Sequence, residues 1–286
     1  MLTLALSLGA AACAEPAPDP DDRDQTVELA GYQLVVATAT TTPRDAQVQV
    51  ACPKGTVILG GGFATLDDTG AYLEGTATAM VPSFDGRTWL VNGRNLAGVG
   101  SWQLRARAVC AAAPKGYQVL TGITSVDSVP TKQLALACPA GQVATGAGFA
   151  TVDSTGVWVA GEATYFSPSW DGHAWLMNAQ PFRIAQPWAL RGWLVCVADG
   201  AVAGYQVHTT ESALVAGADE QVIGACPGQA MIGAGWGVLD DTYAILTGRA
   251  TAHEVDYRGR SWLTNAQNHS SFAPRWRLQQ RALCAN

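Results

Sequence analysis

The sequence predicts an all-β protein made of three tandem repeats, each an antiparallel β-sandwich or barrel-like unit with one disulfide. Six of the seven cysteines form three pairs with the same separation of 58 positions. Apolar and polar residues alternate in many short segments, and no 12-residue stretch keeps an apolar stripe at helical spacing. Glycine, proline and aspartate separate these segments, which is typical of antiparallel sandwiches and barrels.

The repeats share one order of motifs. Each opens on Gly-Tyr-Gln, then carries Cys-Pro, a glycine-rich run, an acidic turn, two tryptophans and a closing cysteine. This order divides the chain into the predicted repeats 31–115, 116–203 and 204–286. The predicted disulfides join Cys52 to Cys110, Cys138 to Cys196, and Cys226 to Cys284.

Six short strands are predicted in the first repeat, and the other two repeats follow the same pattern. They lie near residues 32–39, 46–52, 56–65, 71–80, 88–94 and 102–110. The segment from Trp102 to Ala108, for example, sends every second side chain to one face. The recurrent aromatic residues are predicted to form the core. The recurrent glycines are predicted to mark bulges, or places where a side chain would collide with the next strand.

The sequence leaves two arrangements of the repeats open. They could follow one another as separate beads, or they could close into a body with pseudo-threefold symmetry. The linkers, 111–115 and 197–203, are short. Short linkers favour contact between neighbouring repeats.

The N-terminal segment indicates export. Residues 1–13 form a short apolar stretch that ends at Cys13 and resembles a bacterial lipoprotein signal, in which this cysteine is lipidated. The alternative is an ordinary secretory signal cleaved near Ala12. Residues 14–30 are acidic and proline-rich, which predicts an extended tether. Both alternatives place the repeats outside the cytoplasm, as a lipid-anchored or a secreted protein, where disulfides persist.

Charge and hydropathy exclude two kinds of partner. Residues 14–30 carry six acidic residues and one basic residue of a chain whose net charge is −6, so the three repeats are close to neutral. A neutral body without a basic face is not expected to bind nucleic acid. No apolar run reaches 18 residues, so contact with a membrane is expected only through a lipid on Cys13. The sequence does not define the oligomeric state.

Catalytic chemistry is not expected. The four histidines, His173, His208, His253 and His269, do not recur at equivalent positions of the repeats. The sequence contains no nucleophile-elbow, zinc-protease or phosphate-binding motif. We therefore expect no catalytic residues and no cofactor, and a secreted hydrolase is the weakest of the functional alternatives.

Acidic turns recur in the three repeats and offer a calcium site as an alternative. Carboxylates in loops are the ligands that calcium prefers. Aspartate is equally common in turns because its side chain caps its own backbone. The middle repeat lacks the second aspartate, and no further acid recurs nearby, so no metal is expected. The calcium candidates are Asp67, Asp68, Asp153, Asp240 and Asp241.

Three aligned turns are the candidate binding sites. Each places an aromatic residue before a glycine, in the segments 83–87, 169–173 and 256–260. An aromatic ring on a turn with polar neighbours can stack on a sugar ring, and three copies would add avidity. The alternative is that each ring folds back over its repeat as a packing lid. The candidate ligand-binding residues are Phe84, Asp85, Trp170, Asp171, Tyr257 and Arg258.

These motifs resemble a repeat found in secreted bacterial proteins. The resemblance rests on Cys-Pro-x-Gly-x-x-x-x-Gly-Gly-Gly from Cys52 to Gly62, and on Trp-x-Leu-x-x-x-Ala-x-Cys from Trp102 to Cys110. The second repeat departs from it at 144–146, and the third at 227–229. The resemblance implies a disulfide-stapled extracellular β module and implies no activity.

The sequence therefore predicts a non-catalytic extracellular or cell-surface lipoprotein. Its three repeats are expected to bind a glycan or another surface ligand. The alternative is a purely structural component of the envelope or matrix.

Overall fold

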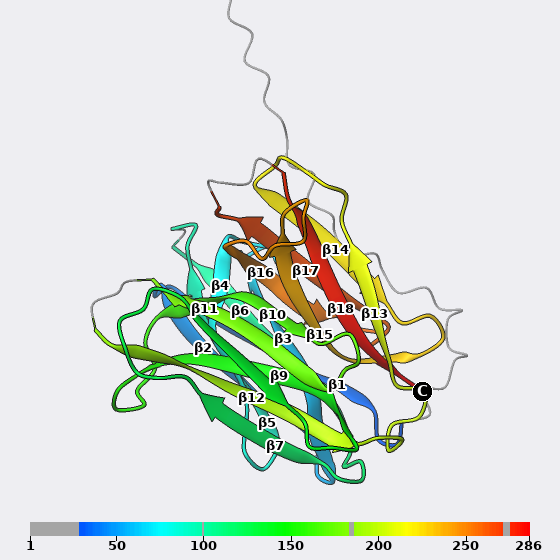
Figure 1. The fold of residues 1–286 in the computed structure, drawn as a ribbon. Coiled ribbons are helices and arrows are strands. Elements are labelled where there is room, and N and C mark those ends of the chain that lie inside the picture. The colour runs from blue at the N-terminus through cyan, green and yellow to red at the C-terminus, as the bar shows by residue number, and fades with distance from the viewer. Residues whose placement is uncertain (1–28, 99, 183–185, 271–274) are drawn as a thin grey trace, which may run out of the picture.

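The computed structural model describes residues 29–98, 100–182, 186–270 and 275–286, and it is built from 18 strands without a helix in these ranges (Figure 1). The all-β prediction is confirmed. Repeat 1 contains β1 (Gln33–Thr41), β2 (Asp45–Ala51), β3 (Thr56–Leu66), β4 (Gly75–Pro82), β5 (Thr88–Asn95) and β6 (Trp102–Ala112). Repeat 2 contains β7 (Gln118–Ile123), β8 (Lys132–Ala137), β9 (Gln142–Asp153), β10 (Gly161–Pro168), β11 (Ala174–Pro181) and β12 (Trp188–Ala198). Repeat 3 contains β13 (Gln206–Glu211), β14 (Asp219–Ala225), β15 (Ala230–Leu239), β16 (Gly248–Val255), β17 (Ser261–Asn268) and β18 (Arg277–Ala285).

Each repeat is a sandwich of two three-stranded layers. In repeat 1 the layer β1-β6-β3 packs against the layer β2-β5-β4. Cys52 directly follows β2, and its partner Cys110 lies in β6, so the disulfide ties one layer to the other. The three predicted disulfides are all present.

The layers do not end at the borders of the repeats. The structure has three six-stranded antiparallel sheets, and each sheet combines three strands of one repeat with three strands of another. The 1–2 sheet is β2-β5-β4-β9-β12-β7, the 2–3 sheet is β13-β18-β15-β10-β11-β8, and the 1–3 sheet is β1-β6-β3-β16-β17-β14. Because every repeat shares a sheet with both others, the chain forms the closed pseudo-threefold body and not a row of beads.

Glycines allow the central strands to approach one another. A Cβ atom on Gly60 would lie within 3.0 Å of the carbonyl oxygen of Ile232, which is closer than Cβ atoms pack in proteins. Gly146 stands in the same relation to Leu59, and Gly233 to Thr145. Each glycine of this set therefore meets the backbone of another repeat, in a cyclic order that returns to the start.

A second set of three glycines repeats this cycle two residues further along. The pairs are Gly62 with the carbonyl of His253, Gly148 with that of Met80, and Gly235 with that of Phe166. The pairing of β3 with β6 also shifts its register between Ile58 and Gly60. Both predicted roles of the glycines, at bulges and at close approaches, are confirmed.

The tyrosine of each Gly-Tyr-Gln motif fastens its repeat to a neighbour. The Tyr117 hydroxyl of repeat 2 donates to the carbonyl of Ile58 in repeat 1 at 3.0 Å. Tyr205 of repeat 3 donates to Ala144 at 2.7 Å. Tyr32 of repeat 1 donates to the carbonyl of Met231 in repeat 3 at 2.9 Å, so that each repeat is bonded to both others. Burial, with a smaller contribution from the negative charge of Asp256, raises the pKa of Tyr32 well above its usual range, so this phenol stays protonated.

The predicted aromatic core is confirmed. Six recurrent tryptophans are buried: Trp89, Trp102, Trp175, Trp188, Trp262 and Trp276. The second tryptophan of each repeat also donates its indole N–H to a backbone carbonyl, as Trp102 does to Pro43 at 2.7 Å. No helix of the described residues is long and apolar enough to cross a bilayer.

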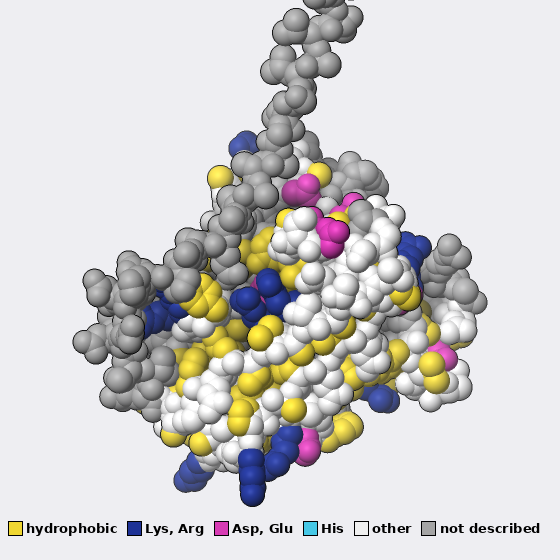
Figure 2. Space-filling view, turned by 180° about the vertical axis from the view of Figure 1, so that it is seen from behind, with side chains coloured by type: hydrophobic (Ala, Val, Ile, Leu, Met, Phe, Trp, Pro, Cys, Tyr) yellow, Lys and Arg dark blue, Asp and Glu magenta, His cyan; other side chains and the backbone are white. Residues whose placement is uncertain are grey.

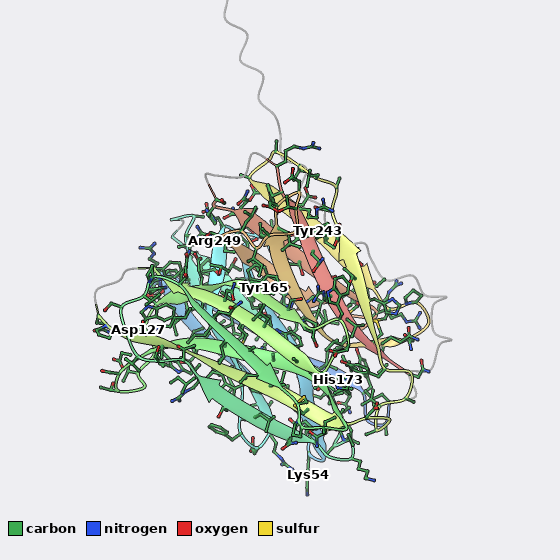
Figure 3. The ribbon with its side chains drawn as sticks, in the orientation of Figure 1. Lys54, Asp127, Tyr165, His173, Tyr243 and Arg249 are labelled. Atoms are coloured by element: carbon green, nitrogen blue, oxygen red, sulfur yellow. A yellow bond between two sulfur atoms is a disulfide. The ribbon has the colours of Figure 1, made fainter. Side chains whose placement is uncertain are left out.

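All strands run between two ends of the body. We call the end with the segments 83–87, 169–173 and 256–260 the turn end, and the end with the acidic turns after β3, β9 and β15 the acidic end. Lys54 and His173, from the turn end, lie on the side where the C-terminus is marked, whereas Asp127 and Tyr243, from the acidic end, lie on the other side (Figures 1 and 3). Equivalent loops of the three repeats therefore lie at the same end.

Candidate functional site

The three candidate turns are rigid hairpin connections. The first links β4 to β5, and Gly86 lies in the left-handed region with φ of 67°. The Ser83 hydroxyl donates to Asp85 Oδ1 at 2.5 Å, and the Arg87 N–H donates to the same oxygen at 3.0 Å. In the second turn Ser169 and Asp171 make the same bond. In the third turn the N–H of Arg260 donates to Asp256 at 3.0 Å.

The aspartates of these turns act on their own backbone. The hydrogen bond from the Ser83 hydroxyl lowers the pKa of Asp85 below its usual value, and Ser169 does the same for Asp171. Both carboxylates are therefore charged at neutral pH and held in place. Their predicted role as ligand contacts stays a prediction, whereas their role in shaping the turn is visible.

The aromatic rings of the turns face solvent. Phe84 is 73% exposed, Trp170 67% and Tyr257 43%. Most of the surface of Phe84 and Trp170 is therefore free for contact, although Trp170 also packs on Arg281 of repeat 3. Apolar side chains exposed singly are common on protein surfaces, so the notable feature of these rings is their recurrence at equivalent turns.

A neighbouring repeat supports each turn. Gly86 lies against the hydroxyl of Tyr117, so that a Cβ atom at this position would lie within 3.0 Å of it. Gly172 lies in the same way against Tyr205, and Gly259 against Tyr32. The tyrosines that join each repeat to its neighbour therefore also set the position of the aromatic turns.

The surroundings of the three rings differ. The Arg281 guanidinium lies 3.8 Å from the centre of the Trp170 ring. The Arg258 guanidinium lies 5.3 Å from the centre of its neighbour Tyr257. At the position of Arg281, repeat 2 has Trp193, which packs in an apolar cluster with Val81 of the strand that leads to the Phe84 turn. The three turns thus share a backbone conformation but differ in the side chains around the aromatic ring.

The acidic turns cap themselves. Asp67 Oδ1 accepts the N–H of Thr69 at 2.9 Å, its hydroxyl at 2.7 Å and the N–H of Ala71 at 2.9 Å. The Thr69 hydroxyl is the main cause that lowers the pKa of Asp67. Asp153 and Asp240 are bound in the same way.

The self-capping geometry accounts for the recurrence of these aspartates without a metal. Asp68 and Asp241 follow the capping residues and lie on exposed turns. Within the described ranges no group of three or more His, Cys, Asp or Glu side chains is placed to hold a metal ion.

The histidines lie in unrelated places. His173 Nδ1 is 2.7 Å from the Gln142 carbonyl, His208 Nε2 is 3.0 Å from Gln206 Oε1, and His269 contacts Arg249. His253 is fully buried, and its ring nitrogens bind the Ala234 carbonyl at 3.0 Å and the Thr264 hydroxyl at 2.9 Å. These contacts are those of structural side chains.

The buried histidine makes stability depend on pH. Burial lowers the pKa of His253 from 6.5 to about 4. Between pH 6.5 and pH 4 this histidine is protonated in the unfolded chain but neutral in the folded chain. The free energy of unfolding therefore falls by about 3 kcal/mol as the pH falls from 6.5 to 4. We expect His253→Phe, which copies Phe166 of repeat 2, to remove this loss. Urea unfolding at pH 7.5 and pH 4.5 checks it, and an equal pH dependence in variant and parent would contradict it.

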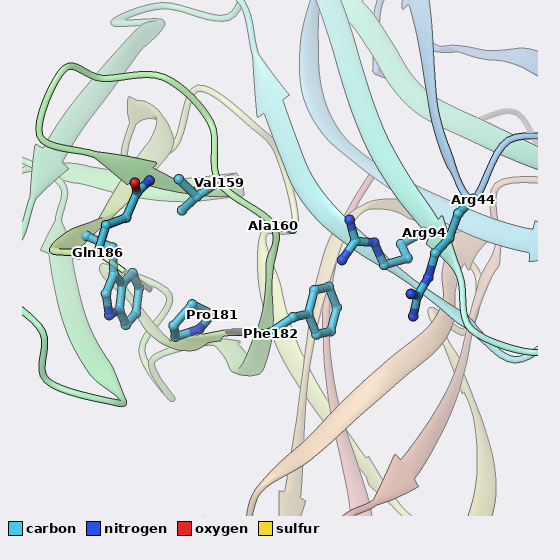
Figure 4. Close-up of a pocket in the computed structure, with 8 residues that line it drawn as sticks. Arg44, Arg94, Val159, Ala160, Pro181, Phe182 and Gln186 are labelled. Carbon is cyan, nitrogen blue, oxygen red and sulfur yellow. The ribbon is translucent and has the colours of Figure 1, made fainter. Parts of the chain in front are cut away.

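One pocket lies between repeats 1 and 2 toward the acidic end (Figure 4). Its volume is about 620 Å³, and its lining residues are Arg44, Arg94, Val159, Ala160, Pro181, Phe182, Gln186 and Trp188. Asp45 binds Arg94 through both carboxylate oxygens, and the Arg94 guanidinium lies 5.0 Å from the centre of the Phe182 ring. The exposed Arg44 could hold an anionic group. The described lining residues combine two arginines with aromatic and apolar side chains.

The surface carries its charges in scattered positions. On the face shown in Figure 2, Lys and Arg side chains stand singly or in small groups between polar and apolar ones. The described residues that are visible on this face form no continuous basic surface.

The chain matches no protein-family model and no curated protein. The resemblance to a repeat of secreted bacterial proteins therefore stays a prediction. Cys13 and the segment 1–28 lie outside the described residues.

Two elements of the site were not predicted from the sequence. Arg281 was not singled out, because it meets the turn of a different repeat. The sequence marks the three tyrosines as the start of each repeat, but it does not show that each hydroxyl binds a neighbouring repeat. Their recurrence beside a glycine was the only available signal.

Proposed function

We propose that this protein is a non-catalytic binding protein of an extracytoplasmic space, and that its turn end binds glycans. One observation supports the proposal most: three aromatic rings, two of them mostly exposed, are held on rigid turns at one end of a closed body. The three disulfides are consistent with an oxidising compartment.

Sugar rings stack on aromatic rings through their apolar C–H faces. Because each turn is fixed by its own hydrogen bonds and by a tyrosine of another repeat, little conformational freedom would be lost on binding. Three sites on one face can engage one polymer together, and the linked binding events raise the overall affinity.

A lipid anchor is part of the proposal. If Cys13 is lipidated, residues 14–30 would act as a spacer between the membrane surface and the repeats. The intact mass of the exported protein tests the anchor: a diacylglyceryl group on Cys13 is expected, and a chain that lacks Cys13 would contradict it.

A glycan array with the purified full chain tests the binding function. We expect Trp170→Ala to weaken binding about tenfold and the triple variant with Phe84→Ala and Tyr257→Ala to abolish it, because each ring supplies about one stacking contact. Trp158→Ala is the matched control, since Trp158 is an exposed tryptophan of the acidic end. Melting temperatures should stay unchanged. An empty array with folded protein would overturn the proposal and favour the structural alternative.

A further inference from the structure

Arg281 is a buried cation without an acidic partner. It lies in β18, on the 2–3 sheet, and only 7% of its surface is exposed. Its Nη1 donates to the Pro168 carbonyl at 2.7 Å, whereas its Nε is buried and has no hydrogen-bond partner. Burial lowers the pKa of Arg281, which is the direction expected for an uncompensated cation.

The carboxylates near Arg281 bind other groups. Glu211 is an acid near enough to act on it, and this carboxylate binds Arg277 at 3.2 Å and Gln279 at 2.7 Å. Asp171, on the turn above, accepts the Ser169 hydroxyl and the N–H of His173. Neither carboxylate forms an ion pair with Arg281 in the part of the chain that the structure describes.

The equivalent arginine of repeat 1 has an acidic partner. Arg107 occupies the position of Arg281, and its Nη1 donates to the Val255 carbonyl at 2.6 Å, as Arg281 does to Pro168. Its Nε lies 3.4 Å from Glu254, a buried acid of repeat 3. At the position of Glu254, repeat 2 has Ser167. Glu254 also binds Arg105 through both carboxylate oxygens. A guanidinium therefore lies between repeats 1 and 3 and between repeats 2 and 3, but a carboxylate lies beside it only between repeats 1 and 3.

Trp170 covers this unpaired cation. The guanidinium lies 3.8 Å from the ring centre on one side, while two thirds of the side chain stays exposed. A guanidinium held against the face of an aromatic ring is attracted by the ring quadrupole and keeps its positive charge there. The surroundings of the Trp170 ring therefore carry a positive potential, which favours an anionic group over a neutral one. Because Arg281 is buried, salt screens its charge less than that of a surface arginine.

We propose that Trp170 and Arg281 form a subsite for an acidic sugar of the uronic acid class. The sugar ring stacks on the exposed face of Trp170, and its carboxylate lies beside the ring, where the positive potential of Arg281 favours an anion. This inference rests on the proposed glycan-binding function and adds its charge preference. Arg281 is a specificity-determining residue here, since it acts through the ring.

The test compares galacturonic acid oligomers with galactose oligomers of the same length, titrated calorimetrically into the full chain. We expect the parent to bind the acidic oligomer at least about tenfold more tightly. Arg281→Met should abolish this preference and keep binding of the neutral oligomer, whereas Arg281→Lys should keep the preference. Trp158→Ala is the control, because Trp158 is an exposed tryptophan of the acidic end, and it should leave both affinities unchanged.

A structural measurement separates this role from a purely stabilising one. Replacing a buried, unpaired cation by an apolar side chain is often neutral or stabilising, so Arg281→Met should melt at the same or a higher temperature. A lower melting temperature together with an unchanged acid preference would overturn the inference and make Arg281 structural. Equal binding of both oligomers by the parent would overturn the inference alone. Binding of neither would overturn the proposed function as well.

Discussion

Gly62→Ala should strongly destabilise the native state. The new Cβ atom would lie within 3.0 Å of the His253 carbonyl oxygen, in the backbone of another repeat, where β3 and β16 pair. Neither backbone can move away without separating the 1–3 sheet. Overpacking of a well-packed core costs about 1–3 kcal/mol, and a clash with backbone at the centre of three repeats should exceed that range, at about 4 kcal/mol or more.

Urea unfolding of Gly62→Ala, followed by tryptophan fluorescence, measures this loss. Gly100→Ala is the matched control, because no atom lies within 4 Å of the position of its added Cβ atom. The control should change stability by less than about 0.5 kcal/mol. If both variants were equally stable, the repeats would not meet through their glycines, and the shared sheets would be wrong.

Removal of one disulfide should cause the second large effect. The double variant Cys52→Ala/Cys110→Ala opens a loop of 58 residues, and the chain-entropy model gives about 4 kcal/mol for a loop of this length. The bond also ties the two layers of the repeat 1 sandwich at the turn end, so its loss should loosen the Phe84 turn first. Chemical unfolding under non-reducing conditions measures the difference.

Cys13→Ser is the control for this variant, because the seventh cysteine has no partner at the 58-residue spacing. It should leave the unfolding midpoint unchanged. A loss below about 1 kcal/mol in the double variant would mean that the sandwich layers are held by packing alone. Free thiols at Cys52 and Cys110 in the parent protein would contradict the pairing itself.

Much of the fold could be predicted because it is local and repeated. Alternation of side chains located all six strands of repeat 1. The fourth strand starts at Gly75 and not near residue 71, since Asp67 folds the intervening segment into a capped turn. The closed pseudo-threefold arrangement of the repeats could not be predicted, because a buried strand such as β3 has the same sequence pattern whichever repeat lies beside it.

Some residues of the candidate site could be predicted from the sequence, and others could not. Phe84, Trp170 and Tyr257 stood out because they recur in sequence. Arg281 did not, because its partner Pro168 is 113 positions away and in another repeat. Only an arrangement of the repeats relative to one another brings the guanidinium beneath the Trp170 ring, and the sequence left that arrangement open.

The central claim is that three repeats form one body by sharing their sheets. Differential scanning calorimetry of the intact, oxidised chain tests it through the ratio of the calorimetric to the van't Hoff enthalpy. A single cooperative body predicts one transition with a ratio near 1. Three separate transitions, or one transition with a ratio near 3, would show that each repeat unfolds on its own, and would contradict the shared sheets.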